Sequence, residues 1–430
     1  MKFELLHPAD QLVLFLNRVY YNGMTTTSGG NLSIMDENGD IFITPSSIDK
    51  GRLTRRDIVQ VKPDGTIIGI HKPSIELPFH TQIYKTRPDF KAVLHAHPPA
   101  LVAFSIARII PSTKLLTDVS EVCGNIEKAD YAIPGSSLLG EKITKQFAQG
   151  FDTILMDNHG AVVGAPDMAT AFKIFETFDF SARLELNARR LGTPIELLDE
   201  QIEAYKNIKI KKYPAFVPTV FTTAERAARH DICAFAERSY NSGLCTSTYG
   251  TFSQRISENA FLITPYNKDR CYLEATDIVK IENGKCEKGK TPSRATEFCE
   301  LVYKMHPEIN AIILSHPAAI MAFAVTAEGF DSRLIPESYI NLRDVSKVPY
   351  GATFMQPKMT SNMFTPKNPT IIVENDCVIT TGATLLKAFD CLEVLDYSAK
   401  SVIDTAVIGD IVKISDGEVD DIVEDFNLPK

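Results

Sequence analysis

Two histidines one residue apart, His95 and His97, have the type and spacing that can hold a metal ion. They end the apolar stretch 91–97, which predicts a short buried β-strand closed by Pro98-Pro99. Alternate residues of a strand lie on one face, roughly 6.6 Å apart, so the two imidazoles could bind one cation. The alternative is a pair of ordinary strand-end histidines. A catalytic zinc site would require a third protein ligand.

His159 is the candidate for that third ligand. It lies in Asn158-His159-Gly160, a predicted turn between two further apolar strands at 154–156 and 161–163. A turn histidine is more often simply solvated, so His159 supports a metal site only in combination with His95 and His97.

Glu76 and His80 form a second polar pair, four residues apart and a short segment upstream. The structural alternative is a glutamate that caps a helix start, which Pro73-Ser74 before it makes plausible. The segment taken alone leaves both interpretations open.

The chain repeats itself once. Ile43-Thr44-Pro45 recurs as Ile263-Thr264-Pro265 after 220 residues, and His97-Pro98 recurs as His316-Pro317 after 219 residues. Order and spacing persist over most of each half, which indicates two homologous domains. We expect them at 1–212 and 219–430.

Each half has the pattern of a mixed α/β domain. Helical spacing of apolar residues predicts helices over 7–21 and 169–191, with a counterpart of the first over 224–240. Short apolar runs predict strands at 31–34 and 41–44, besides those named above. We expect an antiparallel or mixed sheet with helices covering its faces.

The second half keeps the scaffold but lacks the polar cluster. The positions that match the cluster in the second half are Leu314 for His95, Asp376 for His159, Ala295 for Glu76, Cys299 for His80 and His316 for His97. If these residues only supported the fold, the second copy should need them too. Only His97 keeps a histidine partner, and the joint loss of the other four favours a metal site in the first half only.

Composition narrows the class of protein. The chain of 430 residues is 44% hydrophobic and 23% charged, as expected for a folded domain pair, and its net charge of -9 disfavours nucleic-acid binding. We see no apolar run that would span a membrane and no signal peptide. The eight cysteines include no CxxC pair, so we expect reduced thiols in a cytoplasmic protein.

A set of motifs in the first half resembles the class II aldolase/adducin family. That family includes L-fuculose-phosphate aldolase and L-ribulose-5-phosphate 4-epimerase. The resemblance covers about residues 5–200, and more faintly 225–405. The motifs are Ser28–Ser33, Ile43–Ser46, Pro73–Glu76, Arg87–Asp89, Ala92–Pro99 and Asn158–Gly160.

The resemblance implies a site as well as a fold. The fold would be an α/β fold in two tandem copies, each with three layers, α/β/α, around a mixed, mostly antiparallel sheet. It implies zinc (Zn²⁺) or another divalent cation on His95, His97 and His159, with Glu76 as the catalytic acid/base. The residues implied to bind the substrate phosphate are Gly30, Asn31, Ser46, Ser47 and Ser74.

The implied activity is that of a lyase. A metal-dependent aldolase would cleave a ketose phosphate to dihydroxyacetone phosphate and an aldehyde through a metal-stabilised enediolate. A sugar-phosphate 4-epimerase, a sugar-acid-phosphate decarboxylase and a noncatalytic adducin-like binding protein remain alternatives. The last suits the second half better than the first. The expected partner is a small sugar phosphate, with no nucleic acid and no membrane.

The sequence departs from the family pattern in three places. The usual Thr/Ser-Gly is Ser46-Ser47, and the usual Ser-Ser before the glutamate is Ser74-Ile75, which leaves room for another anion or a free sugar. The tyrosine that family aldolases supply from a neighbouring subunit is missing from 110–115. Tyr339, at the matching place in the second half, is our candidate for that catalytic role; a buried or rim tyrosine is the alternative. Because family members form four-fold rings, we expect a homodimer that makes a pseudo-tetramer with two metal sites.

Overall fold

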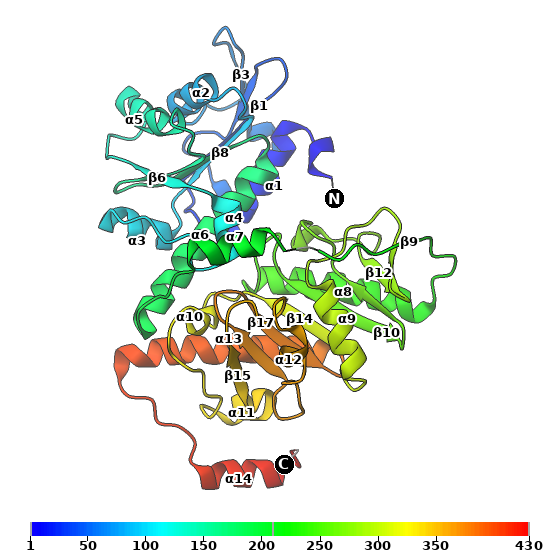
Figure 1. Ribbon diagram of the computed structural model, residues 1–430. Coiled ribbons are helices and arrows are strands. Elements are labelled where there is room, and N and C mark those ends of the chain that lie inside the picture. Colours follow the sequence, from blue (N-terminus) through cyan, green and yellow to red (C-terminus); the bar gives the residue numbers. More distant parts are fainter. Residues whose placement is uncertain (1, 209, 429–430) are drawn as a thin grey trace. The chain divides into compact units, whose positions relative to one another are not determined.

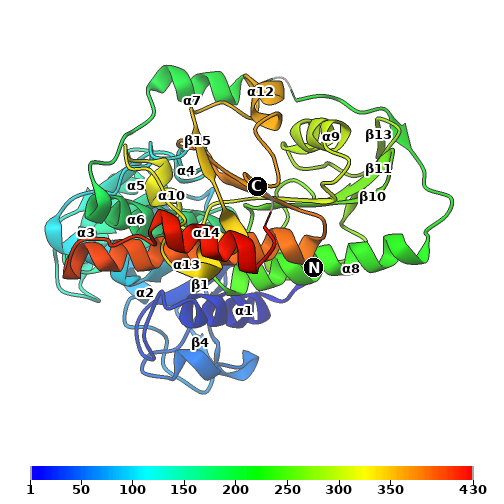
Figure 2. The same cartoon turned by 90° about the horizontal axis from the view of Figure 1, so that it is seen from below.

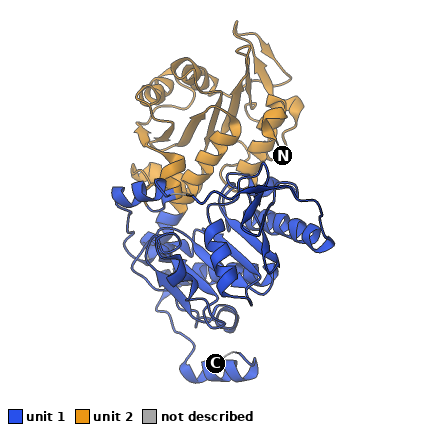
Figure 3. Ribbon diagram, turned by 45° about the vertical axis from the view of Figure 1, so that its right-hand side comes forward, with its two compact units in different colours: residues 1, 115–117, 184–430 blue, residues 2–114, 118–183 orange. Residues whose placement is uncertain are grey.

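The computed structural model describes residues 2–208 and 210–428. The chain forms two compact units, coloured separately in Figure 3. The first-half unit contains Lys2–Lys114 and Asp118–Arg183, and the second-half unit contains Leu115–Thr117 and Leu184–Lys430. The helix α6 (Met168–Leu191) contributes residues to both units. The domain boundaries at 212 and 219 remain a prediction.

The first-half unit is built on one mixed sheet. Among the described residues its strand order is β4-β3-β2-β1-β5-β8-β7-β6, and only β6 and β7 pair in parallel. The strands are β1 (Asn31–Met35), β2 (Ile41–Ile43), β3 (Val59–Val61), β4 (Ile67–Ile68), β5 (Ala92–Ala96), β6 (Ile126–Ala129), β7 (Thr153–Met156) and β8 (Gly160–Ala165).

Helices cover both faces of this sheet. On one face, α2 (Leu77–Thr86) and α5 (Ser137–Phe147) pack together and bury Phe79, Ile83 and Ile143 against the strands (Figure 1). On the other face, α1 (Pro8–Tyr21) meets α6, with the rings of Phe15 and Phe172 at 5.3 Å. The remaining helices are α3 (Pro99–Ala107), α4 (Thr117–Cys123) and the 3₁₀ turns η1 (Phe3–Leu5), η2 (Lys50–Arg52) and η3 (Arg55–Asp57).

Local sequence explains why α1 forms where it does. Leu12, Phe15 and Val19 recur at helical spacing and are fully buried. The ring of His7 accepts a hydrogen bond from the backbone N–H of Ala9 and so caps the first turn. Gly23, just after the helix, has a φ of 68°, the left-handed conformation that commonly ends helices.

The second-half unit repeats this architecture. Among the described residues its strand order is β15-β16-β17-β14-β10-β11-β12-β13-β9, with parallel pairing only at β15–β16 and β13–β9. The strands are β9 (Ala215–Phe216), β10 (Thr251–Ser257), β11 (Ala260–Ile263), β12 (Val279–Glu282), β13 (Lys285–Glu287), β14 (Ala311–Ser315), β15 (Val345–Val348), β16 (Thr370–Val373) and β17 (Val378–Gly382).

Helices again lie on both sides of the strands. Figure 2 shows α9 (Thr296–Met305) on the opposite side of β10 and β11 from α8 (Thr223–Asn241). α8 packs against α13 (Leu385–Ile408) through Phe235 and Phe389, whose rings lie 5.0 Å apart. The other helices are α7 (Asp199–Lys206), α10 (Met321–Ala324), α11 (Pro336–Leu342), α12 (Pro357–Ser361), α14 (Asp416–Asp425) and the turn η4 (Arg270–Tyr272).

The two sheets match strand by strand, which confirms the predicted tandem α/β fold. The order β2-β1-β5-β8-β7-β6 of the first corresponds to β11-β10-β14-β17-β16-β15 of the second. The register also corresponds, because Asn31 pairs with His95 in one sheet and Thr251 pairs with Leu314 in the other. The same backbone therefore carries histidine in one copy and leucine in the other.

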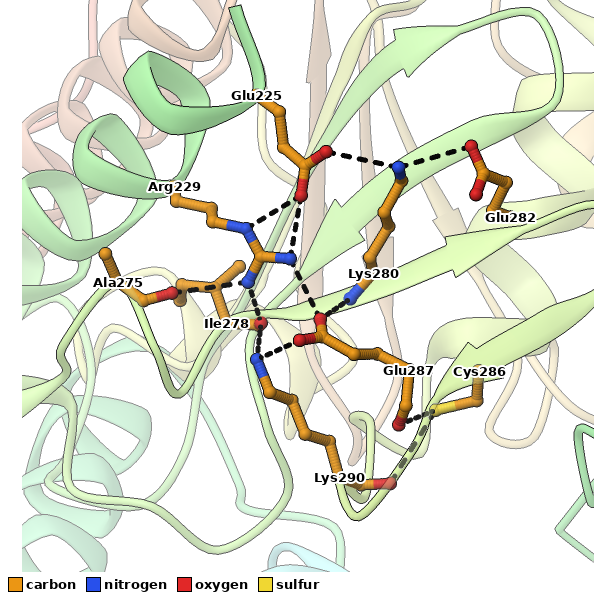
Figure 4. Close-up of polar contacts among 9 residues, drawn as sticks. All are labelled: Glu225, Arg229, Ala275, Ile278, Lys280, Glu282, Cys286, Glu287 and Lys290. Atoms are coloured by element: carbon orange, nitrogen blue, oxygen red, sulfur yellow. Dashed lines mark hydrogen bonds and ion pairs between the residues drawn. The ribbon is translucent and has the colours of Figure 1, made fainter. Parts of the chain in front are cut away.

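A buried group of charges ties α8 to the sheet of the second-half unit (Figure 4). The guanidinium of Arg229 donates to Glu225 at 2.9 Å and to Glu287 at 2.8 Å. The ammonium groups of Lys280 and Lys290 lie 3.1 and 2.8 Å from the same two carboxylates. Each buried charge has a partner of opposite sign, which is the condition for keeping such groups away from water.

Two further observations concern membrane-spanning helices and the cysteines. No helix among the described residues is both long and apolar enough to cross a membrane. None of the eight cysteines forms a disulfide bond, and burial raises the pKa of five of them.

Candidate metal centre

β5 and its neighbours fix the orientation of His95. The residue is fully buried and lies opposite Asn31 of β1 and Val162 of β8. Its Nδ1–H donates to the carbonyl oxygen of Ala161 at 2.9 Å, which directs Nε2 away from that bond. A histidine held through one ring nitrogen presents the other to a metal in a defined direction.

His97 lies just beyond the strand. β5 ends at Ala96, one residue before the predicted end, and the backbone N–H of His97 donates to the carbonyl of Met24 at 3.1 Å. Its position therefore depends on the loop after α1 as well as on strand alternation. The rings of His95 and His97 still meet, with centroids 4.6 Å apart.

His159 reaches the same point from the turn between β7 and β8. Asn158 adopts a φ of 54°, the left-handed conformation that asparagine tolerates in turns. The backbone N–H of His159 donates to the hydroxyl of Ser105 at 3.2 Å, which holds the turn against α3. One ligand atom each of His95, His97 and His159 lies within 4.8 Å of the others.

Two glycines allow the three histidine segments to approach so closely. A Cβ at Gly160 would lie 2.5 Å from the carbonyl oxygen of Ala96 and 2.7 Å from Cδ2 of His97. A Cβ at Gly30 would lie 2.8 Å from the carbonyl oxygen of His95, and Gly30 also has a φ of 69°. The backbone around the cluster is thus built for glycine at both positions.

The three rings are suited to a divalent cation. Burial lowers the pKa of His95 well below its usual value, lowers that of His97, and lowers that of His159 to about 4. The rings are therefore neutral at pH 7 and offer lone pairs. Nε2 of His95 and of His97 is buried and forms no hydrogen bond with a described residue. Such a set of three neutral imidazoles could hold a metal ion and fits zinc with an open position.

Glu76 lies beside this cluster. It directly precedes α2, but its side chain does not cap the helix; its oxygens instead lie 3.3 Å from Nε2 of His95 and 3.6 Å from Nε2 of His159. Burial raises the pKa of Glu76, against the lowering effect of a hydrogen bond from Asn31. A carboxyl whose pKa is raised toward neutrality can both take and return a proton.

A chain of buried hydrogen bonds runs from Glu76 into the core. The amide of Asn31 donates to Oε2 of Glu76 at 2.6 Å, and its oxygen lies 2.5 Å from Nε2 of His80. Nδ1 of His80 lies 2.7 Å from the hydroxyl of Ser33, which lies 2.7 Å from that of Tyr84. In the sequence, His80 was notable only because it lies four residues after Glu76. The replacement of both residues in the second half was the sequence signal that pointed to His80 as part of the site.

The loops expected to bind the substrate phosphate are joined to one another. The N–H of Ser46 donates to the carbonyl of Lys72, and the N–H of Ser74 donates to that of Thr44. The hydroxyl of Ser74 already accepts from the N–H of Glu76, whereas those of Ser46 and Ser47 are exposed and 3.4 Å apart. A role of these loops in substrate binding remains a prediction.

Ser47 occupies a position for which the resemblance implies glycine, and the backbone there has a conformation that favours glycine. Its φ is 57°, in the left-handed region. The matching residue of the second half, Asn267, has a φ of 51°. Both copies therefore keep the turn without the glycine.

Comparison with known proteins gives the family. The sequence model for the class II aldolase and adducin N-terminal domain matches residues 10–186 and matches again over 230–403, more than half of the chain. The chain belongs to the class II aldolase/adducin family. The double match also confirms the tandem duplication expected from the repeat.

Three relatives illustrate the range of activities among similar proteins. The 5-deoxy-D-ribulose 1-phosphate aldolase of Bacillus thuringiensis serovar kurstaki is 28% identical over 197 residues, 45% of this chain and 91% of that protein. The L-fuculose phosphate aldolase of Methanococcus maripaludis is 36% identical over 172 residues, 40% and 89%. The 3-oxo-tetronate 4-phosphate decarboxylase of Haemophilus influenzae is 28% identical over 179 residues, 40% and 85%. Each relative corresponds in length to one half of this chain.

The part of the second family domain that the structure describes contains no comparable centre. Among residues 2–208 and 210–428, the histidines of the first half form the one group of three His, Cys, Asp or Glu side chains placed to hold a metal. Asp376 takes the position of His159, and burial raises its pKa to about 6. The ring centroid of His316, which matches His97, lies 5.7 Å from that of Tyr249.

Tyr339 lies on α11 of the second-half unit. The guanidinium of Arg343 stands over its ring at 5.2 Å, and the ring is partly exposed. Its contribution to a site in the first half remains a prediction.

Proposed function

We propose that the protein is a metal-dependent aldolase, an aldehyde-lyase that cleaves a ketose phosphate to dihydroxyacetone phosphate and an aldehyde. The observation that carries the proposal is Glu76, a buried carboxyl with a raised pKa 3.3 Å from His95, within the cluster of three neutral histidines. The aldolases among the relatives support the choice of reaction. Both relatives act on sugar phosphates, as their names state.

The residues divide the work of such a cleavage. A divalent cation, for which we propose Zn²⁺, supplies a Lewis acid that polarises the substrate carbonyl. His95, His97 and His159 hold that cation, and Glu76 moves a proton to or from the carbon that keeps the electron pair when the C–C bond breaks. The loops at Gly30-Asn31, 46–47 and Ser74 orient the anionic end of the substrate through N–H and hydroxyl groups.

A decarboxylase of a sugar-acid phosphate is the second candidate. The relative from Haemophilus influenzae has that activity by name, and loss of CO₂ next to a carbonyl leaves the same kind of electron pair to be stabilised and protonated. A 4-epimerase would use the same bond cleavage. A purely structural, adducin-like role suits the second half, which keeps a histidine at only one of the three matching ligand positions.

We further propose a cytoplasmic homodimer, with two metal sites in a pseudo-tetramer of domains. The lack of disulfide bonds among the eight cysteines supports a reducing compartment. The dimer follows from the family's four-fold arrangement, in which two fused pairs would replace four separate subunits.

The proposal is tested on the full chain with zinc restored. Purified protein is offered ketose phosphates, free ketoses and a 3-oxo sugar-acid phosphate, and dihydroxyacetone phosphate, epimers and CO₂ are assayed. Glu76→Ala should keep its metal yet lose about 10²- to 10⁴-fold in turnover. Glu297→Ala, at an exposed glutamate of α9 in the second half, is the matched control and should be fully active. Unchanged turnover in Glu76→Ala would show that the acid/base assignment is wrong.

A further inference from the structure

The hydrogen-bond chain behind Glu76 allows one direction when Glu76 is ionised. A carboxylate only accepts hydrogen bonds, so the group of Asn31 that faces Glu76 at 2.6 Å must be its NH₂. The carbonyl of the same amide then faces His80 at 2.5 Å and must accept, so Nε2 of His80 carries the proton.

The far side of His80 completes the chain. With the proton on Nε2, Nδ1 is an acceptor, and the hydroxyl of Ser33 at 2.7 Å must donate to it. The oxygen of Ser33 is then available to accept from the hydroxyl of Tyr84 at 2.7 Å. His80 is fully buried, and burial lowers its pKa to about 3, so the ring is neutral and holds a single proton.

We propose that His80 is a positioning residue for the reaction: as the Nε2–H tautomer it prevents the amide of Asn31 from turning over, and so keeps an N–H donor on the catalytic carboxylate. If the amide turned by 180°, its carbonyl oxygen would face Oε2 of Glu76, and two acceptors would repel each other. The inference rests on the proposed role of Glu76. It adds a residue that never touches the substrate.

The second half serves as an internal comparison. There the outer pair persists, since Tyr303 donates to Ser253 at 3.0 Å, although the hydroxyl of Ser253 now donates to the carbonyl of Leu262. The inner three positions change together, to Thr251, Cys299 and Ala295. The fold therefore keeps the Ser–Tyr pair without a catalytic centre, while the histidine and the asparagine accompany the glutamate.

A packing role is the competing explanation for His80. Its ring stacks on Phe79 at 4.6 Å, and Phe79 in turn meets the ring of His95 edge-on at 5.8 Å. A residue that only fills space would be replaced without loss by an apolar side chain of similar size. A residue that orients Asn31 requires an N–H at the position of Nε2.

The test compares two replacements at this position in the full, zinc-loaded chain. His80→Leu keeps bulk but removes both nitrogens, and should lower kcat about 10- to 100-fold with KM and metal content nearly unchanged. His80→Gln places an amide N–H within reach of the Asn31 oxygen and should recover most of the lost kcat. In the double variant with Asn31→Ala, His80→Leu should cost little more than Asn31→Ala alone. Cys299→Leu, at the matching site of the second half, is the control and should not change kcat.

A spectroscopic measurement tests the same inference without any substitution. Long-range ¹H–¹⁵N correlation spectra of the wild-type protein should show His80 as the neutral Nε2–H tautomer at pH 7. The Nδ1–H tautomer, or full activity in a folded His80→Leu protein, would overturn the inference. If the wild-type chain cleaves none of the sugars, the proposed function fails, and the tautomer still decides whether His80 holds Asn31 as described.

Discussion

Lys50 in the first-half unit shows how burial changes the pKa of a charged side chain. The side chain of Lys50 is 2% exposed, donates to the carbonyl of Pro45 at 2.5 Å, and forms no ion pair with a described residue. Burial lowers its pKa from 10.5 to about 8. The matching residue of the second half, Arg270, is also buried and donates to the carbonyl of Gly250. A buried cation at this place thus belongs to the scaffold of both copies.

Lys50 predicts a specific dependence of stability on pH. Because its folded-state pKa lies below the unfolded value, the unfolded chain binds more protons between pH 8 and 10.5, and the free energy of unfolding should rise with pH in that window. The rise should be on the order of 1–3 kcal/mol and absent in Lys50→Met. Urea unfolding at pH 7, 8, 9 and 10 measures it. Lys85→Met, at an exposed lysine of α2, should keep the rise, and the same profile in both variants would contradict the prediction.

The sequence identified the residues of the candidate site that could be compared with the second copy, but not those that come together only in the folded chain. The three histidines and Glu76 could be found because the second copy lacks three of these four residues, which separates chemistry from scaffold within one chain. The chain from Asn31 through His80 could not, since its members come from β1 and α2, and only the register of the folded sheet brings them together.

At the scale of elements, periodicity predicted most of the fold. The helix expected over 7–21 is α1 (Pro8–Tyr21), and the one expected over 169–191 is α6 (Met168–Leu191). The strand expected over 91–97 ends at Ala96, because the loop after it bonds to the loop after α1 rather than to the sheet. Pairing to partners distant in sequence decides such ends, and periodicity carries no information about it.

The buried group of charges around Arg229 in the second-half unit could not be predicted from the sequence either. Its burial predicts the effect of a substitution on stability. Arg229→Leu leaves Glu225 and Glu287 buried without their main partner, and should lower the free energy of unfolding by about 3–5 kcal/mol. Hydrogen bonds from Arg229 and Lys290 now lower the pKa of Glu287 against the effect of burial, so the loss should be larger at pH 8 than at pH 5.

A second arginine of α8, paired with a glutamate but exposed, serves as the control that tests whether burial causes the loss. Arg238 pairs with Glu393 at 2.9 Å but is 53% exposed, so Arg238→Leu should cost no more than about 1 kcal/mol. Denaturant unfolding followed by far-ultraviolet circular dichroism measures both variants. Equal losses in the two proteins would contradict the argument from burial.

At the scale of the whole molecule, the duplication predicts how many metal ions each chain binds. A chain with one intact and one altered family domain should bind one zinc per 430 residues, not two. His97→Asn should lose that ion, whereas His316→Asn, the matching change in the second half, should retain it. Elemental analysis of dialysed protein gives the ratio. Two ions per chain, or loss of metal in His316→Asn, would show that the second domain also binds metal.

The proposed dimer makes a testable statement about Tyr339. If this tyrosine completes the site of another chain, Tyr339→Phe should lower kcat about 10²-fold or more while leaving metal content unchanged. His97→Asn should also be inactive, for lack of the ion. The two variants lack different residues. A dimer with one chain of each variant is therefore active only if one site combines residues from both chains.

Coexpression of the two variants with different affinity tags isolates the mixed dimer. One of its two sites would combine His97 from the Tyr339→Phe chain with Tyr339 from the His97→Asn chain, so about half of the wild-type activity should return. A tyrosine acting within its own chain would restore none, because neither chain then has both residues. Full activity of Tyr339→Phe would instead leave Tyr339 as a rim residue, and a mass equal to one chain of 47.7 kDa in solution would exclude the shared site altogether.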